Sequence, residues 1–217
     1  EGGVHALEIS KDGRWIVTSD WTDAARVYSR TDLMKQLSNV LLDPAPGRAI
    51  KQLSFTQRGE RTYLLAAANR DIFVWGMAEG CAFSIDGAPL GHSKTITTFE
   101  CSPNGRWLLV GTKGKVPFLW DLESMTLAHE LPSHERRISA VAFTKDGDRF
   151  AIGDWYSVVR VYDWDGENPS TISQKAEFHH EQGKHITDVE FHPQSPAILL
   201  TSSKDCTARL WDVEMNE

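Results

Sequence analysis

Short apolar runs separated by turn residues dominate the hydrophobic pattern, and residues 186–213 show it most clearly. Apolar side chains alternate with polar ones over 186–191, run together at 198–200 and return at 208–211. The turn-forming stretches HPQSP and SKD separate the three runs. Apolar runs of this length, bounded by Pro, Ser and Asp, are typical of β-strands joined by tight turns. The stretch therefore predicts three consecutive strands.

The same three-strand pattern recurs upstream, and each copy ends on an aromatic residue. These aromatics are Tyr28, Trp75, Trp120, Tyr162 and Trp211. Successive positions differ by 47, 45, 42 and 49 residues. A period of about 40–50 residues, with room for a fourth strand in each copy, is the sequence signature of a β-propeller. We therefore predict an all-β fold built from repeated four-stranded sheets.

Two local features refine this prediction. Asp-Gly or Asn-Gly pairs end at Gly13, Gly105 and Gly147, where the first hairpin of a repeat should turn. Glycine supplies the positive φ that such tight turns require. In the long connection over 29–48, we expect a helical turn at 33–37 and a fourth strand at 40–42.

Terminal dipeptides strengthen the repeat assignment. Three repeats close on Trp120-Asp121, Tyr162-Asp163 and Trp211-Asp212, and two open on a histidine, His92 or His134. With these features the chain resembles the WD-repeat family over nearly its whole length. The resemblance implies a WD-repeat β-propeller in which residues 1–217 form a single domain or a fragment of one. The expected blade units are 4–49, 50–91, 92–133, 134–184 and 185–217.

The number of strands predicts how the ring closes. Five copies of the first three strands are visible, but there are only four spaces for a fourth strand. A propeller must close, because an unpaired edge strand invites association. We therefore expect the chain to be part of a propeller with seven or more blades.

The composition indicates which kinds of partner the chain can bind and in which cellular compartment it lies. The net charge of −7 argues against a broad nucleic-acid or anionic-membrane surface and leaves room only for a local basic patch. No apolar run reaches the ~18 residues of a membrane span. Cys81, Cys101 and Cys206 form no CxxC pair. We therefore expect buried free thiols in a reducing compartment, and an intracellular location, cytoplasmic or nuclear.

No motif points to catalysis, a cofactor or a metal. The sequence contains no GxSxG, P-loop or GxGxxG pattern. Four histidines lie at 179, 180, 185 and 192, but a strand separates the first three from the last. Zinc needs three or four converging ligands, which opposite ends of a strand do not provide. We predict no enzyme, no catalytic residue, no cofactor and no metal.

The resemblance also implies a structural tetrad of buried hydrogen bonds. In the family, a histidine before the first strand, a Ser or Thr on the second, an Asp in the next turn and a Trp on the third are joined in this way. Only the last repeat supplies a full set, with His180 or His185, and Ser202 or Ser203. The set that we expect is His180, Ser203, Asp205 and Trp211. It resembles a hydrolase triad, but we expect it to be structural.

The resemblance implies that loops before the first strand and between the second and third strands form a partner-binding face. Trp, Tyr and Arg are enriched in interface hot spots. The alternative is that the aromatic side chains tuck under neighbouring loops. The predicted partner-binding residues are Trp21, Arg70, Lys113, Lys115, Arg136, Arg137, Trp155, Tyr156 and Lys184.

Three hypotheses for the function follow. The first is a non-catalytic scaffold subunit that binds other proteins in a multiprotein assembly. The second is a peptide reader, because the last repeat resembles that of a Polycomb histone-tail reader; Trp21, Trp155 and Tyr156 would then cage methyl-lysine. The third is a non-catalytic subunit of a nucleic-acid-modifying or ribosome-biogenesis complex, in which Lys113, Lys115, Arg136 and Arg137 form a local patch for nucleic acid.

Overall fold

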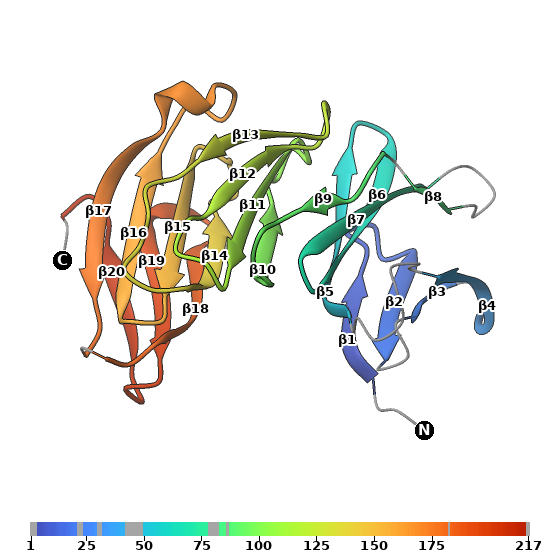
Figure 1. Ribbon diagram of the computed structural model, residues 1–217, viewed down its shortest axis with the longest axis horizontal. Coiled ribbons are helices and arrows are strands. Elements are labelled where there is room, and N and C mark those ends of the chain that lie inside the picture. The colour runs from blue at the N-terminus through green and yellow to red at the C-terminus, as the bar shows by residue number, and fades with distance from the viewer. Residues whose placement is uncertain are drawn as a thin grey trace. The chain divides into compact units, whose positions relative to one another are not determined.

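The computed structural model describes residues 4–20, 24–29, 32–41, 50–77, 83–85, 87–181 and 183–215, which are drawn as ribbon in Figure 1. The described elements are strands and one short 3-10 helix. The chain divides into two compact units, residues 1–96 and 97–217. The all-β prediction is confirmed, whereas the five blade boundaries within one domain remain a prediction.

The first unit contains two antiparallel sheets. The first sheet has the order β1-β2-β3-β4. Its strands are β1 (Val4–Ile9), β2 (Trp15–Asp20), β3 (Ala24–Ser29) and β4 (Asp32–Leu41). The second sheet has the order β5-β6-β7-β8, and β9 also pairs with β7. Its strands are β5 (Ile50–Arg58), β6 (Arg61–Ala68), β7 (Asp71–Met77), β8 (Phe83–Ile85) and β9 (Leu90–Gly91).

The second unit contains three antiparallel sheets, with the orders β10-β11-β12-β13, β14-β15-β16-β17 and β18-β19-β20. The first consists of β10 (Ile96–Cys101), β11 (Trp107–Thr112), β12 (Phe118–Asp121) and β13 (Thr126–Glu130). The second consists of β14 (Ile138–Phe143), β15 (Arg149–Asp154), β16 (Val158–Asp163) and β17 (Ser173–His179), with the 3-10 helix η1 (Pro169–Thr171) before β17. The third consists of β18 (Ile186–His192), β19 (Ser195–Ser203) and β20 (Ala208–Asp212).

One predicted element is wrong. Residues 33–37 lie inside β4 and do not form a helical turn. This strand pairs with β3 from Asp32, opposite Ser29, to Leu41, opposite Ala24. Pairing along the length of a neighbouring strand outweighs the weak helical preference of a few residues.

The sheets repeat the same local irregularities, which identifies them as copies of one unit. The register shifts near the start of the first strand in four sheets, between Val4 and Ala6, Ile50 and Gln52, Ile138 and Ala140, and Ile186 and Asp188. Three first hairpins also turn through a glycine with positive φ, namely Gly13, Gly105 and Gly147. The predicted glycine turns are therefore confirmed.

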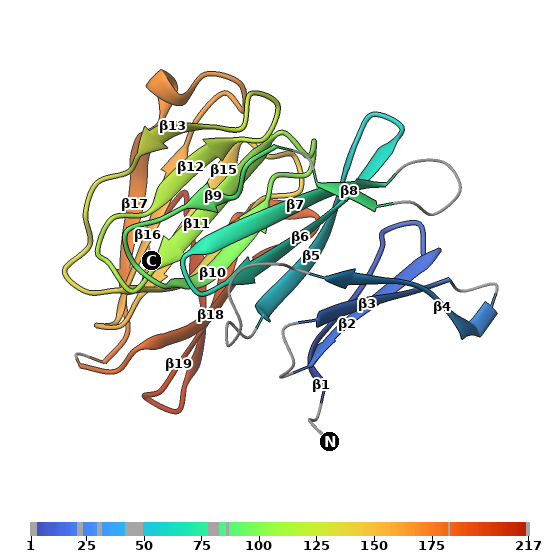
Figure 2. The same cartoon turned by 45° about the vertical axis from the view of Figure 1, so that its right-hand side comes forward.

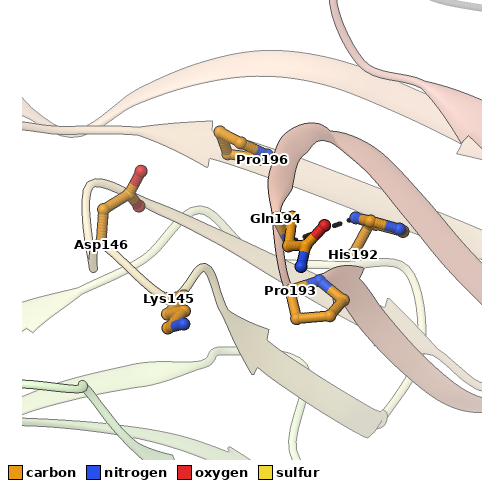
Figure 3. Close-up of a pocket in the computed structure, with 6 residues that line it drawn as sticks. All are labelled: Lys145, Asp146, His192, Pro193, Gln194 and Pro196. Carbon is orange, nitrogen blue, oxygen red and sulfur yellow. Dashed lines mark hydrogen bonds between the residues drawn. The ribbon is translucent and has the colours of Figure 1, made fainter.

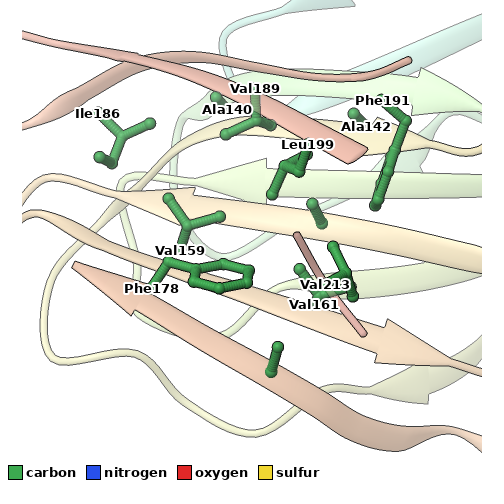
Figure 4. Close-up of a cluster of buried hydrophobic side chains, with 12 residues drawn as sticks. Ala140, Ala142, Val159, Val161, Phe178, Ile186, Val189, Phe191, Leu199 and Val213 are labelled. Carbon is green, nitrogen blue, oxygen red and sulfur yellow. The ribbon is translucent and has the colours of Figure 1, made fainter. Parts of the chain in front are cut away.

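Apolar side chains pack between consecutive sheets. One core contains Trp107, Leu109, Phe150 and Ile152, so it joins the sheets β10–β13 and β14–β17. A second joins β14–β17 to β18–β20 through residues such as Phe178 and Leu199 (Figure 4). Figure 2 shows the sheets of the second unit from a second side. Antiparallel four-stranded sheets that pack face to face in sequence order are the blades of a β-propeller.

Two glycines allow neighbouring sheets of the second unit to approach closely. A Cβ atom on Gly153 would lie 2.7 Å from Cγ2 of Ile186, and one on Gly111 would lie 2.5 Å from Cγ2 of Ile138. Both glycines occur on the second strand of a sheet and face the first strand of the next sheet. The absence of a side chain therefore sets the distance between sheets at these positions.

The cysteines differ from the prediction in one respect. Neither Cys101 nor Cys206 is part of a disulfide, but Cys206 is exposed and Cys101 is only partly buried, whereas buried thiols were expected. Cys206 has a φ of 68° in the hairpin between β19 and β20, where a side chain projects from the turn. Cys81 lies outside the described residues.

Candidate functional site

A chain of hydrogen bonds joins four side chains at the last sheet. Nδ1 of His180 lies 2.9 Å from Oδ2 of Asp205, and its Nε2 lies 2.7 Å from Oγ1 of Thr201. The indole N–H of Trp211 donates to the same Thr201 oxygen over 2.8 Å. Every group is satisfied if His180 donates from Nδ1 to the carboxylate and Thr201 donates to Nε2. This network contains three of the four predicted tetrad residues.

The predicted Ser203 is not part of this chain of hydrogen bonds, and Thr201 occupies its place. The two residues lie on the same face of β19, because side chains two apart in a strand point the same way. Ser203 instead lies at the end of the strand, where its hydroxyl donates to the carbonyl of His185 and accepts the backbone N–H of Asp205. Its hydroxyl therefore belongs to the turn, and the hydroxyl deeper in the sheet reaches Trp211.

Hydroxyl, imidazole and carboxylate in series resemble a catalytic triad, but their burial supports a structural role. The side chains of His180 and Asp205 are 0% and 1% exposed, and Thr201 is buried. Burial alone would raise the pKa of Asp205. Hydrogen bonds from Thr207, the backbone N–H of Glu181 and His180 outweigh burial and hold that pKa well below its usual range. The Thr201 oxygen also accepts the Trp211 N–H, so it is not presented to a substrate.

The preceding sheet contains a shorter version of this network. The backbone N–H of His134 donates to the carbonyl of Lys115, just as that of His180 donates to Ser157. The two histidines therefore occupy equivalent positions. Nδ1 of His134 lies 3.3 Å from Oδ2 of Asp154, and both side chains are fully buried. The sequence prediction missed Asp154, because it expected the acidic residue in the turn and not at the end of the second strand.

A second group of side chains lies at one end of the strands in the second unit. The loops that follow β11, β13, β15, β17 and β19 all come to this end, because successive strands are antiparallel. Backbone hydrogen bonds join the loops, from Trp155 to Arg137 and from Lys204 to His185. Figure 1 shows these loops along the lower edge of the sheets β14–β20. We call this end the basic edge and define it by Lys113, Lys115, Arg136, Arg137, Lys184 and Lys204.

Most of the predicted partner-binding residues are brought together here. Five of the six cations are among them, together with Trp155 and Tyr156. The loop of Lys204 was expected at this face, but Lys204 was not among the predicted binding residues, and His185 was considered for the tetrad but not for partner binding. Arg70 lies in the first unit, in the turn between β6 and β7, where its carbonyl accepts the backbone N–H of His92. Trp21 lies outside the described residues.

Aromatic rings form the centre of the basic edge. The imidazole of His185 stacks on the indole of Trp155, with centroids 4.3 Å apart and planes 6° apart. The guanidinium of Arg137 lies over the same indole ring, and that of Arg136 lies 5.3 Å from the centroid of Tyr156. Trp155 remains 41% exposed. Cations held against aromatic faces gain both attraction and a fixed orientation.

The cations of the basic edge differ in their ion pairing from the cations in the rest of the second unit. Across residues 97–181 and 183–215, the six cations of the basic edge form no ion pair with a carboxylate. The remaining cations of these ranges, except Lys145, each pair with an Asp or Glu; they are Arg106, Arg149, Arg160, Lys175 and Arg209. Burial lowers the pKa of His185, and the charges of Lys204 and Arg137 lower it further. The unpaired positive charges are therefore concentrated at one end of the strands.

Two shallow grooves lie at the opposite end. One, of about 310 Å³, is lined by Lys145, Asp146, His192, Pro193, Gln194 and Pro196 (Figure 3). The backbone N–H of Gln194 donates to Nδ1 of His192 within it. The second is lined in part by Arg149, which is already bound by Asp163 and Glu214. The pair with Glu214 joins neighbouring sheets, whereas the pair with Asp163 lies within one sheet. Among the described residues, no unpaired buried polar side chain lines either groove.

The described residues contain no group of three or more His, Cys, Asp and Glu side chains arranged to hold a metal ion. Among the same residues, no helix has the length and apolar character needed to cross a membrane.

The packed four-stranded sheets define a protein of the β-propeller class. A family model described as "WD domain, G-beta repeat" matches residues 80–121, 125–163 and 173–212, which is more than half of the chain. The chain therefore belongs to the WD-repeat family, as the sequence resemblance predicted.

Similar proteins cover different shares of the chain. WD repeat-containing protein 1 of Rattus norvegicus is 23% identical over 98% of this chain and 34% of its own length. A guanine nucleotide-binding protein subunit beta-like protein of Encephalitozoon cuniculi is 28% identical over 58% of this chain and 37% of its own length. Human WD repeat-containing protein 18 is 29% identical over 56% of this chain. The chain spans about a third of the length of the first two relatives.

Proposed function

We propose that this chain is a non-catalytic interaction scaffold that binds partner proteins in a multiprotein assembly inside the cell. The observation that supports the proposal most strongly is the basic edge, where five exposed cations and the partly exposed Arg137 form no ion pair among the described residues and lie in the same group of loops as the partly exposed Trp155. Trp and Arg side chains at such a surface are typical of interface hot spots. The family relationship agrees with this role, since its members present rigid sheets and variable loops.

A non-catalytic role agrees with the chemistry of the buried networks. The one hydroxyl–imidazole–carboxylate series among the described residues is buried and ends on an indole donor. It supports a stabilising function, in which polar groups fix the packing of consecutive sheets.

The methyl-lysine reader receives less support. Arg137 and Arg136 already lie over Trp155 and Tyr156, the two described rings proposed for a cage. A methylated lysine would have to displace these guanidinium groups and would enter a region of positive charge. The nucleic-acid alternative receives some support from the same cations, but the net charge of −7 confines it to a local contact.

The proposal is tested by comparing two charge reversals, Arg136→Glu and Lys145→Glu. Both residues are exposed and form no ion pair among the described residues of the second unit, but they lie at opposite ends of the strands. Each full-length variant is affinity-tagged in its native cells, and the co-purified proteins are quantified by mass spectrometry. Partners retained by the wild type and by Lys145→Glu should be lost from Arg136→Glu. Equal recovery with both variants would contradict a role for the basic edge in partner binding.

A further inference from the structure

The separation of paired and unpaired cations constrains what the basic edge binds. Elsewhere in the second unit, the arginines form ion pairs with carboxylates. Arg149, for example, pairs with both Asp163 and Glu214. The chain carries an excess of acid, 30 Asp and Glu against 23 Lys and Arg. Pairing partners are therefore abundant, yet among the described residues of the second unit six cations at one edge have no carboxylate partner. Like charges gathered in this way repel each other and lower the stability of the free protein, unless a ligand supplies negative charge.

The two buried acidic side chains near the basic edge do not provide this charge. The Asp205 carboxylate is held by His180, Thr207 and Arg209. The Asp154 carboxylate faces His134 and accepts the backbone N–H groups of Tyr156 and Val158. Both carboxylates are buried and hydrogen-bonded to these partners, so they do not form ion pairs with the exposed lysines.

The geometry also favours a planar carboxylate over a diffuse polyanion. Arg137 and His185 both contact the Trp155 indole, so their donor groups are oriented and not free to rotate. Oriented guanidinium groups bind carboxylates through two parallel hydrogen bonds. Lysines from three separate loops lie at the same end of the strands and would hold further carboxylates along an extended chain.

We infer that the basic edge binds an acidic, extended segment of a partner polypeptide, with Arg136 and Arg137 donating hydrogen bonds to its carboxylates beside Trp155. The inference rests on the proposed scaffold function and names the chemistry of the partner. A polypeptide is favoured over nucleic acid because the exposed acids Glu135 and Glu181 lie in the same loops as the cations. A continuous phosphate backbone would meet these charges, whereas an acidic peptide can place a neutral residue opposite them.

The test uses fluorescence anisotropy with the full chain and three labelled probes of equal length. The probes are a Glu/Gly peptide of about ten residues, which spans roughly 30 Å when extended, the corresponding Lys/Gly peptide, and a single-stranded RNA. The Glu/Gly peptide should bind, and the Lys/Gly peptide should not. Arg136→Glu and Lys204→Glu should each weaken binding by about fivefold or more, and Lys145→Glu should leave it unchanged. Added salt should weaken binding progressively.

Two results would overturn the inference. One is no binding of the Glu/Gly peptide to the wild type. The other is tighter binding of the RNA with the same dependence on Arg136 and Lys204, which would assign the edge to nucleic acid. If partner capture in cells still depends on Arg136 when the acidic peptide fails to bind, the proposed scaffold function stands and only the partner chemistry is wrong. Circular dichroism and urea unfolding of each variant separate loss of binding from loss of fold.

Discussion

Replacing Thr201 by valine tests the buried network directly, because valine has nearly the same shape and lacks only the hydroxyl. In the native chain that hydroxyl lies 2.8 Å from the Trp211 indole nitrogen and 2.7 Å from Nε2 of His180. The substitution therefore removes the partner of one donor and of one acceptor, without opening a cavity. His180 cannot switch tautomer to compensate, because its Nδ1 proton is needed by Asp205.

The expected loss of stability follows from the two groups that lose their partner, the indole N–H of Trp211 and Nε2 of His180. Leaving a buried polar group without a partner costs about 1–3 kcal/mol. His180 is fully buried, whereas Trp211 is only partly buried and its N–H can recover some solvation. We therefore expect Thr201→Val to lower the free energy of unfolding by about 2–4 kcal/mol. Thr201→Ser keeps the hydroxyl and loses one methyl group, so its expected loss is only about 1 kcal/mol.

Urea unfolding followed by far-ultraviolet circular dichroism measures this difference. Ser202→Ala is the matched control, since Ser202 is adjacent, faces the opposite side of β19 and bonds to the exposed Thr187; its expected effect is within about 0.5 kcal/mol. The central expectation is that Thr201→Ser is more stable than Thr201→Val, although valine preserves more apolar volume. The reverse order would refute the view that the hydrogen bonds at Thr201 stabilise the sheet.

Three further predictions address packing and charge. Gly153→Ala should lower the free energy of unfolding by about 1–3 kcal/mol, because the added Cβ would lie 2.7 Å from Ile186; Gly91→Ala, whose nearest contact is 3.6 Å, should have little effect in the same urea experiment. Burial, with smaller contributions from Asp188 and Glu190, raises the pKa of Glu100 to about 7. A raised pKa in the folded state means that stability is fully present below the unfolded value of 4.5 and is lost as the pH rises through about 7. Glu100→Gln should therefore be more stable than the wild type at pH 8, by at most about 3 kcal/mol, and equally stable at pH 4. Urea unfolding of both proteins between pH 4 and pH 8 measures this difference in stability. A difference that stays constant with pH would disprove the raised pKa of Glu100. Lys204→Met should raise the pKa of His185, because it removes one of the two cations that lower it; proton NMR titration of the imidazole should show no change if the charges do not interact.

Much of the fold was predictable because each repeat carries the same short sequence patterns. The aromatic ending each third strand and the Gly turns at Gly13, Gly105 and Gly147 recur at nearly constant spacing, and both act through neighbouring residues. The helical turn at 33–37 was wrong, because the pairing of β4 with β3 is a contact between strands that short-range propensity does not include.

The residue types of the buried hydrogen-bond network were predictable, but one of its four residues was not. His180, Asp205 and Trp211 were identified by position, whereas the choice between Thr201 and Ser203 depended on depth along β19. Both hydroxyls share a face, so alternation alone does not separate them. The basic edge was predicted as a set of loops that included the loop of Lys204, but His185 joins it by stacking on Trp155, which is far away in the sequence. Whether a cation is paired depends on carboxylates from other strands, which no local pattern reveals.

Lysine reactivity in the captured complex tests the proposed interface most directly. Lys113, Lys115, Lys184 and Lys204 belong to the basic edge, whereas Lys145 and Lys175 do not, so the chain provides its own internal controls. Amine labelling of the free chain and of the complex, followed by mass spectrometry, compares all six. The proposal predicts that the four lysines of the basic edge lose reactivity in the complex and that Lys145 and Lys175 keep theirs. Protection of Lys145 and Lys175 with the basic edge still fully reactive would contradict it.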